Sequence, residues 1–212
     1  MTKHTKIALL GGAGRTGKYL INNLLQKGYQ LKLLLRKPEE FILDHSSVEV
    51  IKGDAVDFKS IRQVFSTCDA VINTMGQRPG ETMVASNATR LILENMKTFR
   101  INRYITLAGI NIDTPFDKKE KETIIATEWM KTNYPDIQAD RQKAYSLLDR
   151  SDLDWTLVRV PFIEFNNDNN PIDVYLKDCR GSKVSASSIA EFLSKQLSAD
   201  DYIRQSPFIS NK

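Results

Sequence analysis

The stretch IALLGGAGRTG at residues 7–17 decides the fold. Its apolar half predicts a buried strand, and its second half carries three glycines in the spacing G-x-x-G-x-x-G, at Gly11, Gly14 and Gly17. Apolar residues then recur at helical spacing over residues 19–25. A strand, a glycine turn and a helix in this order are typical of the loop that binds the pyrophosphate of a dinucleotide.

Each glycine of this loop has its own physical reason. Gly11 turns the chain with a positive φ, Gly14 lets the backbone approach the phosphates, and Gly17 lets the helix pack close to its strand. The N-terminus of the helix then supplies N–H donors to the anion. A glycine-rich turn without a ligand is the alternative interpretation.

The composition indicates one globular domain over residues 1–212. With 41% hydrophobic and 26% charged residues, the chain is large enough to enclose a core and a small-molecule cleft. The net charge of +4 comes from 30 basic and 26 acidic residues spread along the chain, which predicts a mixed surface and no nucleic-acid partner. The alternating charges of residues 117–122 predict an exposed helix face.

The cysteines and the N-terminus bear on the compartment. Cys68 and Cys179 lie far apart, without the spacing of a metal site or a disulfide framework. The N-terminus enters a strand without the apolar core of a signal peptide, and no apolar stretch reaches the length of a membrane span. We therefore expect a cytoplasmic protein with no metal and no membrane partner.

Short apolar runs alternate with amphipathic segments up to Pro161. This alternation predicts an α/β fold, a doubly wound parallel sheet with helices on both faces. The predicted strands are residues 31–35, 48–51, 70–73, 104–107 and 155–160, and the predicted helices are 58–65, with Asp57 as N-cap, 83–96 and 140–149.

Beyond Pro161 the pattern weakens, and we expect a small subregion that forms the substrate side of the cleft. Residues 172–176 and 183–184 are candidates for a pair of strands, and residues 189–197 for a helix. No linker divides the chain, so we expect a single domain.

The residue after the second strand bears on the choice of cofactor, because ligands of an open parallel sheet bind beyond the carboxyl ends of its strands. Arg36 stands where an NAD-specific protein would place a carboxylate for the ribose 2′-hydroxyl. A guanidinium suits a 2′-phosphate, which favours NADP over NAD. Arg15 is a second candidate for this pocket, or a solvent-facing residue of the first helical turn.

Two further strand ends carry candidate ligand groups. Asp54 and Ala55 follow the third strand, where the adenine edge is expected, although Asp54 also suits an ordinary turn. Asn73, Thr74 and Met75 follow the fourth strand, beside the expected path of the nicotinamide ribose. A turn with no ligand is the alternative there.

Together with the segment LDWTLVRVP at residues 153–161, these motifs resemble the atypical short-chain dehydrogenases. The resemblance runs from Lys6 to about Leu197 and is strongest to the small NAD(P)H-binding group that includes flavin reductase/biliverdin reductase B and the NADH-flavin reductases. It implies a Rossmann fold, a nicotinamide cofactor and a flat substrate placed over the nicotinamide.

The resemblance also implies roles for the residues that match its motifs. The pyrophosphate would be held by Gly11, Gly14, Arg15, Thr16 and Gly17. The other implied contacts are Arg36 for the adenosine phosphate, Asp54 and Ala55 for adenine, Asn73, Thr74 and Met75 along the ribose and nicotinamide, and Pro161 and Phe162 beside the nicotinamide ring.

The catalytic residues of the family are not matched. Active relatives combine a serine or threonine after the fifth strand with a Tyr-x-x-x-Lys helix, which exchanges a proton with a carbonyl. Here Gly109 stands at the serine position, and Thr106 is expected in the core. Arg141 occupies the lysine register, where it can hold an anionic group or the cofactor ribose. Lys143 and Tyr145 are expected as exposed helix residues, so no catalytic residue is assigned.

The leading hypothesis is an oxidoreductase that transfers hydride from NADPH to a flavin, such as FMN or riboflavin, or to a similar flat acceptor. Such a reaction needs stacked partners more than a dedicated acid. The long connection over residues 111–135 suits a lid or binding loop. Aromatic candidates for covering the acceptor are Phe116, Trp129, Phe162 and Phe165, with packing of its own helix as the alternative for Trp129.

A second hypothesis is a non-catalytic redox sensor of the NmrA-like kind, which binds a dinucleotide and signals to a protein partner. The missing hydroxyl and Tyr-x-x-x-Lys motif favour it, whereas the short chain counts against it. A sugar-nucleotide epimerase or dehydratase is disfavoured because those enzymes resemble longer chains with the intact motif. The sequence leaves a monomer and a dimer equally open.

Overall fold

A central sheet organises the protein in the computed structural model, which describes residues 5–77, 80–168 and 170–212. Its eight strands are β1 (Lys6–Leu10), β2 (Gln30–Leu35), β3 (Val48–Lys52), β4 (Ala70–Asn73), β5 (Arg103–Gly109), β6 (Asp154–Val160), β8 (Ile172–Tyr175) and β10 (Phe208–Asn211). They lie in the order β3-β2-β1-β4-β5-β6-β10-β8, and all neighbours are parallel except β10 and β8. This is the strand order of a Rossmann fold, extended at one edge.

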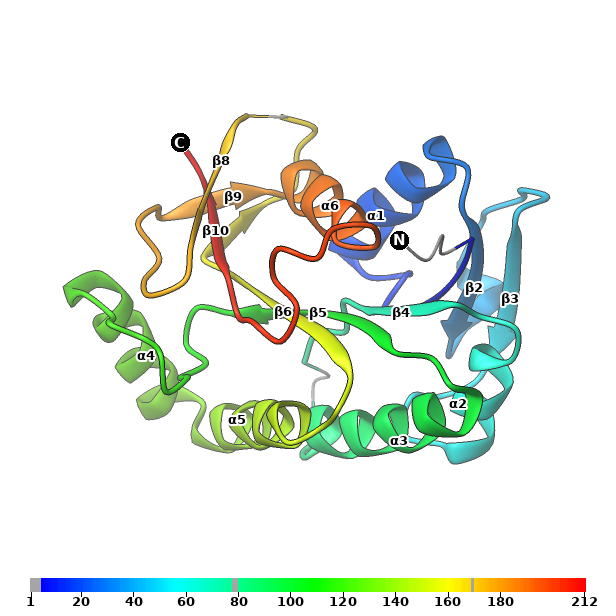
Figure 1. The fold of residues 1–212 in the computed structure, drawn as a ribbon, viewed down its shortest axis with the longest axis horizontal. Coiled ribbons are helices and arrows are strands. Elements are labelled where there is room, and N and C mark those ends of the chain that lie inside the picture. The colour runs from blue at the N-terminus through cyan, green and yellow to red at the C-terminus, as the bar shows by residue number, and fades with distance from the viewer. Residues whose placement is uncertain (1–4, 78–79, 169) are drawn as a thin grey trace.

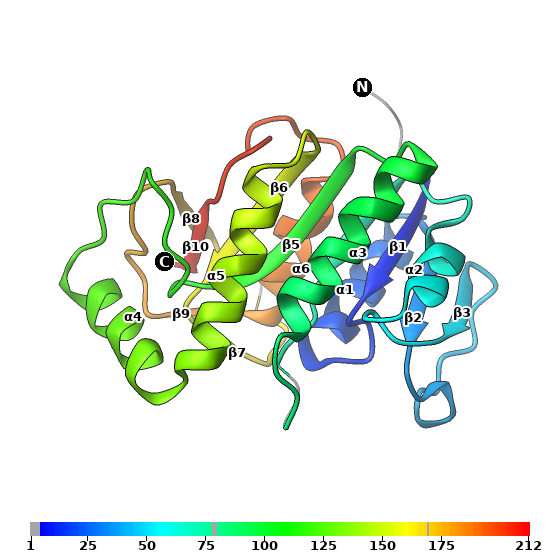
Figure 2. The ribbon, with the colours of Figure 1, turned by 90° about the horizontal axis from the view of Figure 1, so that it is seen from below.

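Helices cover both faces of the sheet (Figure 1). They are α1 (Arg15–Gln26) and α6 (Ala186–Lys195) on one face, and α2 (Phe58–Phe65), α3 (Val84–Phe99) and α5 (Pro135–Asp149) on the other. A further helix, α4 (Lys121–Asn133), lies beside α5 at the β8 end of the molecule (Figure 2). The predicted doubly wound α/β fold is confirmed.

The apolar run of the opening stretch explains the centre of the sheet. All four residues from Ile7 to Leu10 are fully buried, and Leu9 lies beside Leu33 of β2 and Ile72 of β4. Strands covered on both faces need such continuous apolar runs, because both of their sides face a helix layer. The predicted N-cap is also confirmed, since the Asp57 carboxylate accepts a hydrogen bond from the Ser60 amide at 2.8 Å.

The C-terminal strands pair differently from our expectation. A 3₁₀ turn η1 (Pro38–Glu40) follows β2, and a separate small sheet joins β7 (Phe162–Glu164) to β9 (Lys183–Ser185). The predicted pairing of residues 172–176 with 183–184 is therefore wrong, because β8 pairs with β10 and β9 pairs with β7. The strand β10 was not predicted, although its Phe208 pairs with Arg159 of β6.

The expected exposed helix face at residues 117–122 is wrong in its first half. The helix α4 begins only at Lys121, and the carboxylate of Asp117 lies 2.7 Å from the guanidinium of Arg159. The Lys119 side chain is buried as well and pairs with Asp113 at 2.7 Å. Asp113 and Asp117 pair with basic side chains of the fold, so the alternation of charge along residues 117–122 did not by itself indicate an exposed segment.

Arg159 joins three parts of the chain. Its side chain is 0% exposed, and besides Asp117 its guanidinium donates hydrogen bonds to the carbonyl oxygens of Ile112 and Ser206. The guanidinium also stacks on the ring of Phe208, 3.5 Å from its centroid. It therefore fastens the connection over residues 111–120 and the last strand to β6.

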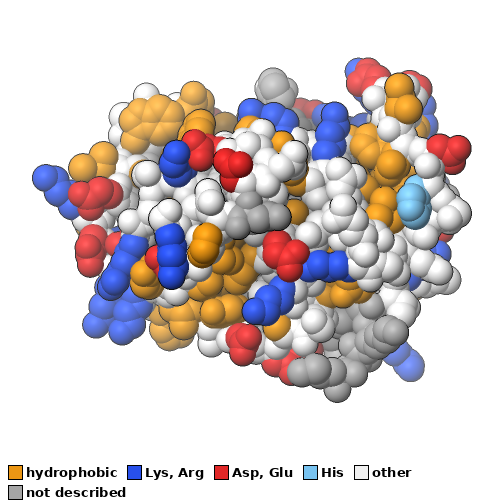
Figure 3. All heavy atoms as spheres, turned by 90° about the horizontal axis from the view of Figure 1, so that it is seen from above, with side chains coloured by type: hydrophobic (Ala, Val, Ile, Leu, Met, Phe, Trp, Pro, Cys, Tyr) orange, Lys and Arg blue, Asp and Glu red, His pale blue; other side chains and the backbone are white. Residues whose placement is uncertain are grey.

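The surface carries both signs of charge. Figure 3 shows basic and acidic side chains interspersed with hydrophobic ones over one face of the molecule. None of the helices within the described part of the chain is long and apolar enough to cross a membrane.

Candidate functional site

A cleft of about 850 Å³ opens where the carboxyl ends of the parallel strands meet. The residues that line it follow β1, β2, β3, β4, β5 and β6, so each of these strand ends contributes a wall. The strand order reverses between β1 and β4, and a crevice at such a switch point is the usual binding place in this fold.

Gly11 and Gly14 of the glycine loop line the cleft. Gly11 has φ +82°, and a Cβ at this position would lie 2.7 Å from the backbone nitrogen of Met75. A Cβ on Gly17 would lie 2.6 Å from the carbonyl oxygen of Gly12 and would also collide with that of Gly11. Only glycine permits these two close approaches.

The first turn of α1 is open to an anion. Gly14 is the N-cap and gives the helix no side-chain cap, and the first turn contains no acidic residue. Gly14, Arg15 and Thr16 all line the cleft, so the uncapped amides lie at its wall. The loop therefore fits a pyrophosphate, which would complete the hydrogen bonds that the helix N-terminus leaves unmade.

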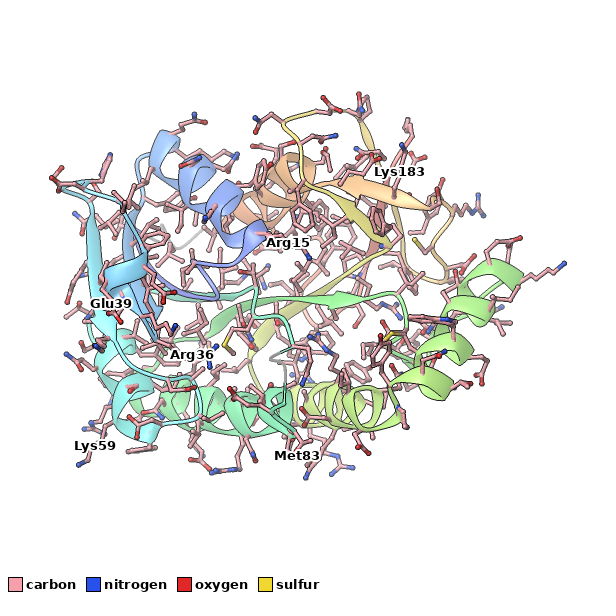
Figure 4. The ribbon with its side chains drawn as sticks, turned by 180° about the vertical axis from the view of Figure 1, so that it is seen from behind. Arg15, Arg36, Glu39, Lys59, Met83 and Lys183 are labelled. Atoms are coloured by element: carbon pink, nitrogen blue, oxygen red, sulfur yellow. The ribbon has the colours of Figure 1, made fainter. Side chains whose placement is uncertain are left out.

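The wall beyond β2 and β3 matches the expected adenosine end in part. Arg36 and Ala55 line the cleft, and Figure 4 shows Arg15 at the start of α1 and Arg36 after β2. The Arg36 guanidinium is ion-paired with Glu81 at 3.0 Å. Asp54 is not among the lining residues, and its carboxylate accepts a hydrogen bond from the Val56 amide at 3.1 Å, as in an ordinary turn.

The loop after β4 is tied to the glycine loop. Thr74 and Met75 line the cleft, and the Thr74 hydroxyl donates to the carbonyl oxygens of Leu10 and Gly11, both at 3.3 Å. Asn73 is buried and faces the other way. Its Oδ1 accepts from the Met75 amide at 2.9 Å, so this residue shapes the turn that presents Met75 to the cleft.

The substrate end of the cleft includes Pro161 but not Phe162. The Phe162 side chain is 73% exposed and lies outside the lining, whereas Phe165 is part of it. The Arg15 guanidinium stacks on the Phe165 ring at 4.1 Å and bridges the glycine loop to this end. Of the four aromatic candidates for covering an acceptor, only Phe165 lines the cleft; Phe116 and Trp129 are exposed.

Sequence reasoning missed several lining residues that come from the long connection before α5. These are Asn111, Met130 and Tyr134, and a further missed lining residue, Ile137, lies in the first turn of α5. The length of that connection was the signal that could have found them, since the segment was expected to be a binding loop. The side chains of Met130, Tyr134 and Ile137 are largely apolar, which suits this end of the cleft to a flat, largely apolar molecule.

The serine position of the family is closed by packing. A Cβ on Gly109 would collide with the Oδ1 atom of Asn111. Asn111 is buried and held by Gln138, whose Nε2 donates to the Asn111 carbonyl oxygen at 2.8 Å. Thr106 is buried in β5 and lines a separate chamber of about 60 Å³ between the sheet and the helices α3 and α5, not the cleft.

Tyr145 is not the exposed residue that we expected. It is 7% exposed, and its ring meets Trp155 edge-on with the centroids 6.3 Å apart. Burial raises the pKa of its phenol to about 12. Tyr145 lines the small chamber, while Lys143 is exposed as predicted.

Arg141 lines both the cleft and the chamber. Burial lowers the pKa of its guanidinium. In residues 5–77, 80–168 and 170–212, no group of three or more His, Cys, Asp or Glu side chains is arranged to hold a metal ion.

The strand order, the glycine loop and the cleft at the switch point together define a Rossmann protein of the atypical short-chain dehydrogenase/reductase class. The chain belongs to the NAD(P)H-binding family, whose model matches residues 11–200. The family match confirms the resemblance to the NAD(P)H-binding atypical short-chain dehydrogenases that the sequence motifs indicated.

Two curated proteins match this chain at low sequence identity. The chain is 19% identical over 153 residues to the uncharacterized protein YwnB of Bacillus subtilis, covering 72% of this chain and 70% of that one. It is 26% identical to eugenol synthase 1 of Petunia hybrida over 125 residues, covering 53% of this chain and 38% of that protein.

A solved structure shares the whole fold. It is a short-chain dehydrogenase/reductase from Veillonella parvula in complex with NADP, with a TM-score of 0.84 and 18% identity over 99% of this chain and 95% of that one.

Proposed function

We propose that the protein is an NADPH-dependent reductase that transfers hydride to a flat acceptor such as a flavin. The observation that carries this proposal is one continuous cleft, which runs from the uncapped glycine loop to an apolar end beside Phe165 and Met130. A nicotinamide cofactor and an acceptor stacked in such a cleft react by proximity and orientation.

The bound dihydronicotinamide would supply a hydride, which carries two electrons and one proton. The chain's own part is to bind and orient. Gly14 and Thr16 hold the pyrophosphate, Pro161 borders the nicotinamide, and Phe165 and Met130 exclude water from the acceptor. The acceptor takes the hydride at one atom and a proton from solvent at another, so no serine or tyrosine of the chain has to donate.

Arg36 supports the preference for NADPH. A guanidinium at this strand end binds a 2′-phosphate by charge-assisted hydrogen bonds. The Veillonella parvula protein of the same fold was crystallised with NADP. We expect the Arg36→Glu substitution to weaken binding of NADPH far more than binding of NADH; equal loss for both would refute the role of Arg36.

A non-catalytic redox sensor is the second candidate. It is favoured by the closed serine position at Gly109 and by the burial of Tyr145 away from the cleft. Both candidates bind a dinucleotide, so only turnover separates them.

The test is a titration of the protein with NADPH and NADH, followed by NADPH oxidation with FMN, riboflavin and a quinone. Tight NADPH binding with steady turnover supports the reductase. Tight binding without turnover on any acceptor replaces it by the sensor, and no binding refutes both.

A further inference from the structure

We propose that the substrate of this cleft carries an oxyanion, a carboxylate or a phosphate, and that Arg141 binds it. This inference rests on the proposed reductase function, because the bound anion is a substrate only if the protein is an enzyme. The binding of a flat anion by Arg141 can nevertheless be measured without turnover.

The position of Arg141 is the first reason. It lies on α5, at the boundary between the cleft and the small chamber, where its neighbours in both linings include Leu107, Ala108 and Met75. Ile137, one turn earlier on α5, and Tyr134, at the N-terminus of the same helix, line this end as well. A cation therefore lines the largely apolar part of the cleft.

The lack of a protein partner is the second reason. Arg141 makes no hydrogen bond or ion pair with any residue that the structure describes. The carboxylate beside it in the sequence, Asp140, is occupied elsewhere. Asp140 is buried and accepts hydrogen bonds from the Ala85 and Ser86 amides at 2.8 and 3.0 Å, at the start of α3.

The charge of the cleft is the third reason. Among the described residues that line the cleft or the chamber there is no aspartate or glutamate. The other two lining cations already have contacts, since Arg15 stacks on Phe165 and Arg36 pairs with Glu81. No carboxylate among the described lining residues therefore opposes the charge of Arg141, and the carboxylate that does favour it electrostatically, Asp140, is already held by the amides at the start of α3.

The chemistry of arginine fits an oxyanion here. A guanidinium keeps its proton even when burial disfavours its charge, and its planar donors match a carboxylate or phosphate through two parallel hydrogen bonds. A partly buried cation without a partner is unfavourable until an anion joins it. The alternative occupant is the cofactor's own ribose or phosphate, and the experiment separates the two.

The binding test uses the protein saturated with NADP⁺ and two probes of the same shape, 2-naphthoate and its neutral analogue 2-naphthamide. Calorimetry is expected to show that the wild type prefers the carboxylate. The Arg141→Met substitution is expected to weaken 2-naphthoate on the order of 10- to 100-fold and to leave 2-naphthamide unchanged. Lys143→Met, which removes the same charge from an exposed position of the same helix, is expected to change neither.

A kinetic comparison adds the acceptor itself. FMN and riboflavin share one ring system and differ by a phosphate. The ratio of kcat/KM for FMN to kcat/KM for riboflavin therefore reports how much the phosphate contributes to recognition. Arg141→Met is expected to lower this ratio through the KM of FMN, and Arg141→Lys to retain most of it.

Equal affinity of the wild type for the two naphthalene probes would overturn the proposal, as would equal weakening of both by Arg141→Met. Weaker NADP⁺ binding by Arg141→Met, with the probe preference intact, would assign Arg141 to the cofactor and also overturn it. If no acceptor is turned over but the carboxylate preference depends on Arg141, the anion site stands and the reductase function fails.

Discussion

The ion pair between Asp117 and Arg159 gives a sharp prediction about stability. Arg159 is completely buried, and Asp117 is its sole carboxylate partner within the described chain. The Asp117→Asn substitution keeps the shape of this side chain and removes its charge. The guanidinium then remains buried without an opposite charge, among the carbonyl oxygens of Ile112 and Ser206, the ring of Phe208 and the one amide oxygen that the substituted side chain keeps.

The contacts that remain around Arg159 set the expected loss in the free energy of unfolding. Removing one partner of a buried pair costs about 3–5 kcal/mol, because the other charge stays out of water without compensation. Two carbonyl groups and an aromatic ring still solvate Arg159, so we expect the lower end, about 3 kcal/mol. For a chain of this size, roughly 2–4 °C of Tm corresponds to each kcal/mol, so the Tm should fall by about 6–12 °C.

Thermal unfolding followed by circular dichroism measures this shift. The matched control is Glu128→Gln on α4, because the side chains of Glu128 and its partner Lys131 are 61% and 44% exposed. We expect the control to cost below about 1 kcal/mol. If the two variants have the same Tm, or if Asp117→Asn has the Tm of the wild type, the buried pair does not stabilise the fold as argued.

The remaining predictions concern single sites. Gly17→Ala should lower the free energy of unfolding, measured in urea, by about 1–3 kcal/mol, because the added Cβ meets the backbone of the glycine loop. The control Gly76→Ala has open space at its Cβ and should change this free energy by less than about 0.5 kcal/mol. Equal effects of the two substitutions would contradict the close approach at Gly17. Glu81→Gln should free Arg36 and lower the Kd of NADPH up to about 5-fold without changing that of NADH; calorimetry that shows no selective gain would dismiss the competition. Burial raises the pKa of the Cys68 thiol to about 12, so iodoacetamide at about pH 8 should label Cys68 only after unfolding in urea, and rapid labelling of the native protein, seen by mass spectrometry, would contradict its burial.

The central fold was predictable because buried parallel strands are continuous apolar runs. Residues 7–10 and 70–73 are apolar throughout or nearly so, and both lie fully inside the sheet. The pairing of β8 and β9 was not predictable, because it depends on β10, which returns from the far end of the chain to lie beside β6. Local patterns carry no information about such a return.

The candidate site was predictable where a strand end positions it. The glycine loop, Arg36, Thr74 and Met75 line the cleft because the carboxyl ends of parallel strands share one edge. Burial that arises from distant partners could not be predicted. Tyr145 is buried by packing against Trp155, and Asp117 by Arg159, which lies 42 residues further along the chain.

The contact between Gly109 and Asn111 limits the mutational routes open to this site. Gly109→Ser is a single change in the sequence, yet its Cβ would collide with the Asn111 side chain, which is held in place by its hydrogen bond to Gln138 Oε1. A smaller residue at position 111 would have to come first, at the cost of the hydrogen bond that the Asn111 side-chain amide donates to Gln138 Oε1 on α5. A serine-dependent site at this position therefore requires at least two substitutions in a fixed order. The first of them destabilises the fold before the second can introduce the serine.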